Sequence, residues 1–305
     1  MLTRRTFLAS TMAALPLSAR TRIGISRISA ITDEIARSSQ AAIDFAKQYG
    51  LRWVELRDVP GQNKEYSYLP ENELHAEAEL LEKNGIRVSF LNTSLMKVRI
   101  PGLEPVRWKR YTPAQREQRI QADLPKFERR MDDLRKCLHA GRILGVDKIR
   151  VFTGWRCADP DAAMPRIAEI INEMAVVAAR ERMHLLVENE PACNVATCRE
   201  LAEIVRRLPS KWVGINWDPL NATAYNEAPY PDGYRLLPGK RVLNVQIKGK
   251  SILNYPEKLD WRAILDALDR DGYKGEIGLE THIFGDGQIQ ASHDSMEAIL
   301  KLLKA

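Results

Sequence analysis

The chain has 305 residues, of which 45% are hydrophobic and 28% charged, with 17 glycines, 16 prolines and four cysteines. This composition excludes a mostly disordered chain and a fibrous one, and the length is enough to bury a large core without disulfides or a structural metal. The formal net charge of +6 is small for a nucleic-acid-binding protein. No apolar run beyond the N-terminus reaches the ~18 residues that a membrane span needs.

The first 19 residues have the pattern of an export signal. Arg4 and Arg5 form a twin-arginine pair, an apolar stretch follows over residues 7–17, and Ser18 and Ala19 are small enough for cleavage. We therefore predict a twin-arginine signal peptide over 1–19, and a mature chain over 20–305 that is periplasmic or secreted. Removing the two arginines, with no acidic residue among the 19, lowers the net charge from +6 to +4.

An oxidising compartment would allow disulfides to persist. Cys193 and Cys198 are close enough in sequence to pair, but their spacing alone does not decide whether they do.

After residue 19, short apolar runs rich in β-branched residues alternate with longer amphipathic segments. The runs predict strands at residues 23–31, 53–56, 87–91, 148–152, 184–187, 213–217, 242–247 and 276–279. The amphipathic segments predict helices at 39–49, 70–84, 112–144, 159–182, 197–208, 260–271 and 290–304. Four of the helices are followed by a glycine typical of a helix C-terminus, at Gly50, Gly85, Gly145 and Gly272.

The strands are too apolar to be half-exposed antiparallel strands, so we expect them to be buried and parallel. Eight β-α units in a mature chain of 286 residues predict an α/β fold, a single-domain (β/α)8 barrel of the TIM type. A doubly wound sheet is the alternative. It is disfavoured because residues 31–34, after the first strand, contain none of the glycines of a dinucleotide-binding turn.

Four consecutive strands carry a polar residue near their C-terminal ends. These residues are Glu188, Asp218, Gln246 and Glu280, and in a barrel they would meet at one rim. Three converging carboxylates repel one another, and a divalent cation would relieve that repulsion. An oxygen-rich set favours Mn²⁺ or Mg²⁺, with Zn²⁺ and Co²⁺ as alternatives. The competing interpretation of each acid is a strand-end residue paired with Lys or Arg, and three acids and one amide on four successive strands disfavour it.

Other polar residues are expected near the same rim. Lys248 lies two residues after Gln246 and faces the same side, where it would serve as a charge partner or proton donor. The predicted substrate-binding residues are Asn221, His282, Glu55, Arg57 and Arg156.

The chain resembles the sugar phosphate isomerase/epimerase family of xylose-isomerase-like TIM barrels over nearly the whole mature chain. The resemblance is carried by the order and spacing of residues 31–34, 53–57, 272–275 and 279–280. It implies that Glu188, Asp218, Gln246 and Glu280 hold a divalent metal, and that Glu188 and Glu280 act as base and acid. Family members have histidine at the positions of Gln246 and Asn221, so this chain departs from the family pattern twice.

We therefore predict a divalent-metal-dependent sugar isomerase or epimerase that removes a proton next to a carbonyl. Because sugar phosphates are cytosolic, export favours a free sugar or sugar derivative as the small-molecule carbohydrate partner. One alternative is a lyase or dehydratase on keto-sugars, keto-glycosides or inososes, and another is a non-catalytic carbohydrate-binding barrel. Nucleic acid is not an expected partner, since a repair nuclease of this barrel type would need more than five histidines. No membrane span is expected in the mature chain, and a homo-oligomer is compatible with the sequence.

Overall fold

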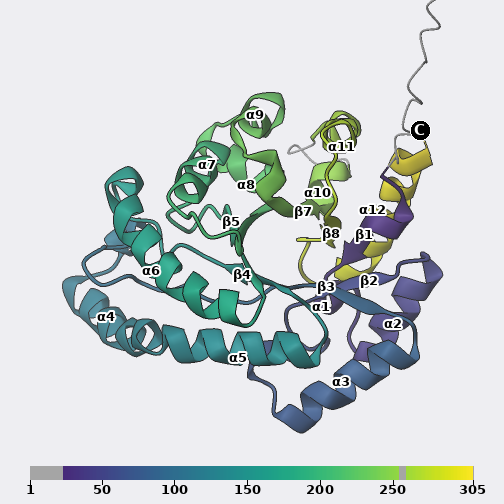
Figure 1. The fold of residues 1–305 in the computed structure, drawn as a ribbon, viewed down its shortest axis with the longest axis horizontal. Helices are drawn as coiled ribbons and strands as arrows, with labels where there is room; N and C mark the ends of the chain where they lie inside the picture. Colours follow the sequence, from purple (N-terminus) through teal and green to yellow (C-terminus); the bar gives the residue numbers. More distant parts are fainter. Residues whose placement is uncertain (1–22, 254–258, 305) are drawn as a thin grey trace, which may run out of the picture.

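The computed structural model describes residues 23–253 and 259–304. Its eight strands form one parallel sheet in the order β1-β8-β7-β6-β5-β4-β3-β2, with helices around the outside (Figure 1). An isolated parallel bridge between Ile31 and Glu55 joins β1 to β2 and nearly closes the sheet into a barrel. The predicted single-domain (β/α)8 barrel is thus confirmed. The predicted signal peptide at 1–19 lies outside the described residues.

The strands follow the apolar runs of the sequence. They are β1 (Ile28–Ala30), β2 (Trp53–Leu56), β3 (Arg87–Leu91), β4 (Lys148–Val151), β5 (His184–Glu188), β6 (Val213–Trp217), β7 (Val242–Lys248) and β8 (Glu276–Glu280). Nearly every strand residue is buried, as expected for parallel strands covered by helices. The first predicted strand was too long, because Ile25–Arg27 form a 3-10 turn and Thr32 begins a short helix.

The helices also match the amphipathic segments, with one correction. They are α1 (Thr32–Ile35), α2 (Ser39–Gln48), α3 (Glu71–Lys83), α4 (Pro113–Glu128), α5 (Arg130–Ile143), α6 (Pro160–Arg180), α7 (Cys198–Arg206), α8 (Pro219–Ala222), α9 (Tyr234–Leu236), α10 (Gly249–Ile252), α11 (Trp261–Arg270) and α12 (Gln288–Lys304). None of the helices in the described part of the chain is both long and apolar enough to cross a membrane.

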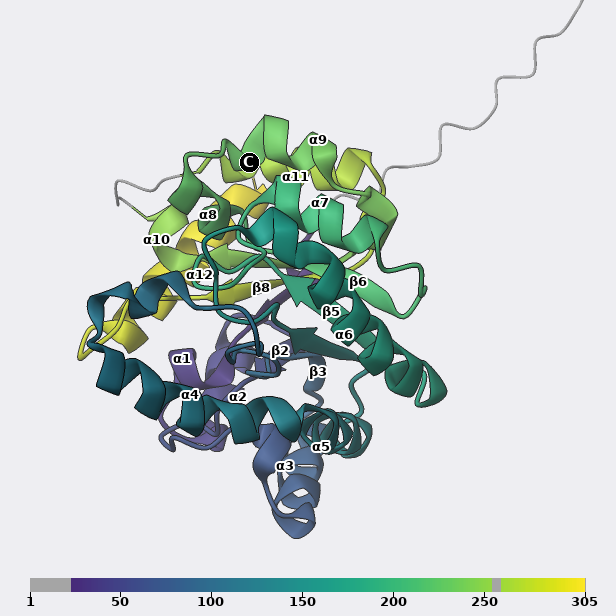
Figure 2. The same cartoon turned by 90° about the vertical axis from the view of Figure 1, so that its left-hand side faces the viewer.

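The single helix predicted over 112–144 is wrong. The chain leaves the helical conformation at Arg129, where φ is −81° and ψ is 5°, and it changes direction between α4 and α5 (Figure 2). Asp132 and Asp133 then lie in the first turn of α5, where acidic side chains stabilise a helix N-terminus. Arg129 Nε also donates a hydrogen bond to Asp133 at 3.1 Å. The amphipathic pattern continued through this break and therefore concealed it.

Helix ends position the loops at the carboxyl ends of the strands. Thr112 and Thr197 each form a capping box with the residue three positions on, at the starts of α4 and α7. The four glycines predicted to end helices all have φ between 69° and 73°. The segment between β3 and α4 contains a short helical turn at Val106–Arg110, and the segment after α8 contains another at Thr223–Tyr225.

Gly278 on β8 is required by the packing inside the barrel. A Cβ atom at this position would overlap the carboxylate of Glu55, which is fully buried. We predict that Gly278→Ala lowers the free energy of unfolding by about 1–3 kcal/mol, because the carboxylate must shift away from its hydrogen-bond donors. Guanidinium denaturation measures this. Gly239→Ala is the control, because the exposed Gly239 has no atom within 4 Å of its Cβ position. An equal loss in both variants would contradict the prediction.

Candidate active site

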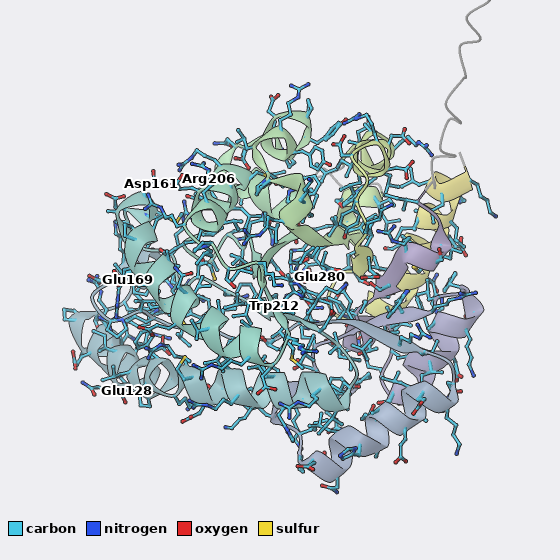
Figure 3. The ribbon with its side chains drawn as sticks, in the orientation of Figure 1. Glu128, Asp161, Glu169, Arg206, Trp212 and Glu280 are labelled. Atoms are coloured by element: carbon cyan, nitrogen blue, oxygen red, sulfur yellow. The ribbon has the colours of Figure 1, made fainter. Side chains whose placement is uncertain are left out.

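Alternate residues of β7 point into the barrel and carry the polar groups of the site. Asn244, Gln246 and Lys248 are all buried, as the period of two along a strand requires. Lys248 is in register with Glu280 on β8, and Gln246 with Gly278. Figure 3 shows Glu280 near the middle of the barrel.

Lys248 occupies the centre of the site. Its Nζ lies 2.9 Å from Oδ2 of Asp218, 2.7 Å from Oδ1 of Asn221 and 3.7 Å from Oε2 of Glu280. Burial alone would lower the pKa of Lys248, but Asp218, Glu280 and Glu188 raise it above its usual value. The Lys248 side chain is therefore a protonated ammonium. The alternation of side chains along β7 correctly predicted that it faces the same side as the predicted metal ligands Asp218 and Glu280.

Arg57 and His282 lie on the other side of Glu280. The Arg57 guanidinium forms ion pairs with Asp33 at 2.6 Å, with Glu34 at 2.9 Å and with Glu280 at 3.6 Å. His282 Nδ1 lies 3.4 Å from Oε1 of Glu280, and the His282 backbone amide donates to Glu34. Burial raises the pKa of Glu280, but Lys248, His282 and Arg57 outweigh it and hold this pKa well below the usual value. The predicted grouping of these residues is thus observed.

Glu188 faces the same interior from β5. Its Oε2 accepts hydrogen bonds from Arg150 at 3.2 Å and from the side-chain amide of Asn216. Burial raises the pKa of Glu188 to about 7, against the opposing effect of Arg150. Arg150 is itself held by the backbone carbonyls of Asn92 and Thr93. This guanidinium was missed from the sequence, where the only signal was a basic residue inside an apolar strand.

Glu55 and Arg156 were predicted to bind substrate, but their polar groups are used within the protein. The Glu55 carboxylate accepts four hydrogen bonds, and the donors are Ser29, Asn92, Asn244 and Gln246. Arg156 forms a bidentate pair with Glu200 and donates to the carbonyls of Cys193 and Asn194. Glu55 therefore holds the strands together inside the barrel, and Arg156 holds the loops that follow β4 and β5.

Three of the four predicted metal ligands have a buried oxygen without a hydrogen-bond donor. These atoms are Asp218 Oδ2, Gln246 Oε1 and Glu280 Oε2. Gln246 presents its oxygen in this way because its Nε2 donates to Glu55 at 2.7 Å, and a carboxylate accepts but does not donate. The Lys248 ammonium lies beside the Asp218 and Glu280 oxygens and compensates their charge, whereas the Gln246 oxygen has no such partner. Carboxylate and amide oxygens are also the ligands that a hard divalent ion prefers, so this donor set fits such an ion.

The balance of charge points the same way. We define the charged cluster as Glu34, Glu55, Glu188, Asp218, Glu280, Arg57, Arg150 and Lys248. With every group ionised, its five acids exceed its three bases by two charges, and burial opposes this state by raising the pKa of Glu34, Glu55, Glu188 and Asp218. A divalent cation would neutralise that excess. Glu34, Glu280 and His282 also have ligand atoms within 4.8 Å of one another, a second arrangement compatible with a metal.

Comparison with known proteins identifies the fold family. Residues 43–304 match the family described as xylose isomerase-like TIM barrel. The chain belongs to this family. No curated protein matches it in sequence.

Solved structures with the same fold include enzymes and a metal-bound protein. The IolI protein with a bound zinc atom has a TM-score of 0.69 and 14% identity, covering 91% of this chain and 98% of its own. The 3-keto-D-glucoside 4-epimerase YcjR of E. coli has a TM-score of 0.62 and 14% identity, covering 92% and 100%. The probable 3-DHS dehydratase AsbF of Bacillus anthracis has a TM-score of 0.66 and 15% identity, covering 92% and 99%. At these identities the likeness shows a shared fold.

In this xylose isomerase-like barrel, the cysteines are free thiols. All four are buried, and Cys198 Sγ accepts a hydrogen bond from Trp217 at 3.3 Å. The disulfide considered between Cys193 and Cys198 is not formed. Burial raises the pKa of Cys193 to about 12.

We predict that the thiols of the native protein resist alkylation, because a buried thiol with a raised pKa forms little thiolate. Mass spectrometry after iodoacetamide at pH 8 should find no adduct in the native state and four adducts after unfolding without reductant. Fewer than four adducts in the unfolded, unreduced chain would mean that a disulfide exists.

Proposed function

We propose that the protein is a sugar isomerase or epimerase that removes a proton next to a carbonyl group. The observation that carries this proposal is a set of three buried oxygens inside the barrel. Those of Asp218 and Glu280 face only the Lys248 ammonium, and that of Gln246 has no hydrogen-bond donor. Glu188 completes the set from β5. The C-terminal rim is where TIM barrels place their reacting groups.

The residues that would hold a divalent cation are Glu188, Asp218, Gln246 and Glu280, with Mn²⁺ or Mg²⁺ favoured by the oxygen donors. When bound, the ion would stabilise the negative charge that develops on the substrate oxygen as the proton leaves.

The chain's own groups would perform the proton transfers. Glu188 on β5 and Glu280 on β8 are separated by β6 and β7, so they reach a substrate in the barrel mouth from two sides. A base on one side and an acid on the other is the arrangement that moves a proton from one face or carbon to another. Lys248, held by Asp218 and Asn221, keeps a positive charge beside the developing anion.

The prediction of export supports an unphosphorylated substrate. If the twin-arginine pattern at Arg4 and Arg5 directs the folded chain out of the cytosol, the enzyme meets free sugars and glycosides rather than sugar phosphates. This inference is part of the proposal.

A cavity lined by loops at the barrel mouth favours a keto-glycoside over a single sugar as the substrate. Because a keto-glycoside carries a leaving group, a lyase is the second candidate reaction. This cavity, of about 490 Å³, is lined by residues that follow β3, β4, β5 and β6, including Arg107, Arg156, Pro191 and Tyr225. One Tyr225 ring face is covered by the Arg156 guanidinium at 4.1 Å, and the side chain is 45% exposed. Apolar walls with an aromatic ring suit the carbon face of a second sugar ring.

The acid and base roles are tested by hydrogen exchange in D₂O with a panel of keto-sugars and keto-glycosides. We predict that Glu188→Gln and Glu280→Gln each lower the rate of α-proton exchange by at least about 100-fold, since an amide does not accept the proton. Glu169→Gln, on the outer surface of α6, is the matched control (Figure 3). Full exchange in either site variant would remove that residue from the mechanism. Release of a leaving group, followed in the same samples, separates lyase from isomerase.

The rim cavity is tested by Tyr225→Ala. We predict that this change raises KM for a keto-glycoside up to about tenfold, the effect of losing one ring contact, while KM for the corresponding keto-monosaccharide stays the same. Tyr225→Phe is the control, because it keeps the ring and removes only the hydroxyl that donates to the Pro191 carbonyl. An equal change with both substrates would show that the cavity does not hold the second ring.

A further inference from the structure

Lys248 shares its oxygen partners with the proposed metal site. Oδ2 of Asp218 and Oε2 of Glu280 are two of the three buried oxygens without hydrogen-bond donors. Both lie beside the Lys248 ammonium, at 2.9 and 3.7 Å. The lone pairs that would bind a divalent ion are thus those that now face a positive side chain.

The ammonium is held in a preformed position. Asn221 accepts a hydrogen bond from it at 2.7 Å, and Asn221 is itself fixed by donating to the Asn189 carbonyl at 2.8 Å and to Asp218 from its backbone amide at 3.0 Å. Ser251 anchors the end of the strand by donating to the Lys248 carbonyl at 2.6 Å. Lys248 is only 3% exposed, so water contributes little to its solvation.

A divalent ion and the ammonium would compete for these oxygens. A divalent ion needs its oxygen ligands at roughly 2.0–2.2 Å, whereas the ammonium is within 3 Å of Asp218. With both present, Asp218 would hold two cations in direct contact at one carboxylate, and their repulsion is only weakly screened in a buried site.

We propose that Lys248 and a divalent cation are alternative partners of Asp218 and Glu280, so that Lys248 weakens metal binding and has to move away when the ion enters. The proposal rests on the metal site of the proposed function and adds the residue that controls its occupancy. Glu190, a carboxylate two residues beyond Glu188, pairs with Lys97 at 3.3 Å and lies within electrostatic reach of Lys248, so the displaced ammonium would share it with Lys97.

The test measures Mn²⁺ binding alone, without substrate, by calorimetry and by the loss of the free-ion spin-resonance signal. We expect Lys248→Met to bind Mn²⁺ at least tenfold more tightly than the wild type and to gain more thermal stability from the ion. Lys274→Met is the matched control, since it removes the same charge from an exposed position just before β8, at the opposite end of the barrel. Its Mn²⁺ affinity should equal that of the wild type.

A second variant covers the case in which Lys248→Met does not fold. Asn221→Ala removes one partner of the ammonium and leaves all four proposed metal ligands, so it should also tighten Mn²⁺ binding, by a smaller factor. Unchanged or weaker binding in the folded variants would overturn the proposal, as would the absence of Mn²⁺ binding from both wild type and variants.

These outcomes are separate from those of the exchange experiment. Tighter binding by Lys248→Met in a protein that exchanges no substrate proton supports the competition and contradicts the enzymatic proposal. Proton exchange in a protein that binds no Mn²⁺ in any form does the reverse.

Discussion

The barrel depends on one buried carboxylate. Glu55 is fully buried, and its two oxygens accept hydrogen bonds from residues of β1, β7 and the segment after β3. Burial raises the pKa of Glu55 and the four donors oppose that rise, so they offset part of the cost of burying the carboxylate. Glu55 also lies where β1 and β2 are joined by a single bridge. The same side chain therefore helps to close the barrel and orients Gln246.

A chain of side-chain amides extends from Glu55 toward Glu188 at the C-terminal end of the barrel. Asn244 donates to Glu55 at 3.1 Å and to Asn216 at 3.0 Å, and Asn216 donates in turn to Glu188. Each amide in the chain has its donor and acceptor directions fixed by a carboxylate that only accepts. The position of Glu188 is thus set by packing and hydrogen bonds across three strands, and it does not depend on a mobile loop.

The sequence predicted the strands and the rim residues well for a common physical reason. A parallel strand buried on both sides must be apolar, so a polar residue within such a run has to face other polar groups inside the barrel. Glu188, Asp218, Gln246, Lys248 and Glu280 all follow this logic in being buried, and the structure brings Lys248 beside Asp218 and Glu280. Arg57 and His282 also lie where their strands direct them.

The remaining features depend on contacts between distant segments, which a local pattern does not contain. Arg156 donates a hydrogen bond to Glu200, which is 44 positions away in the sequence. Gln246 donates one to Glu55, which is 191 positions away. The break at Arg129 could not be predicted because α4 and α5 are both amphipathic, and the pattern of apolar residues continues from one helix into the next. The alternation of side chains along a strand predicted that Lys248 faces the barrel interior. Its contact with Asp218, which follows the neighbouring strand, could not be predicted from that alternation.

The two departures from the family pattern have a common physical interpretation. An amide, like a neutral imidazole, has a donor on one side and an acceptor on the other. Gln246 donates to Glu55 and leaves its oxygen free, while Asn221 donates to the Asn189 carbonyl and accepts from Lys248. Each amide therefore preserves the polarity that a histidine would have at its position, but it does not take up and release a proton near neutral pH. In the proposed mechanism both amides would keep a binding and orienting role, and proton transfer would fall to the carboxylates of Glu188 and Glu280.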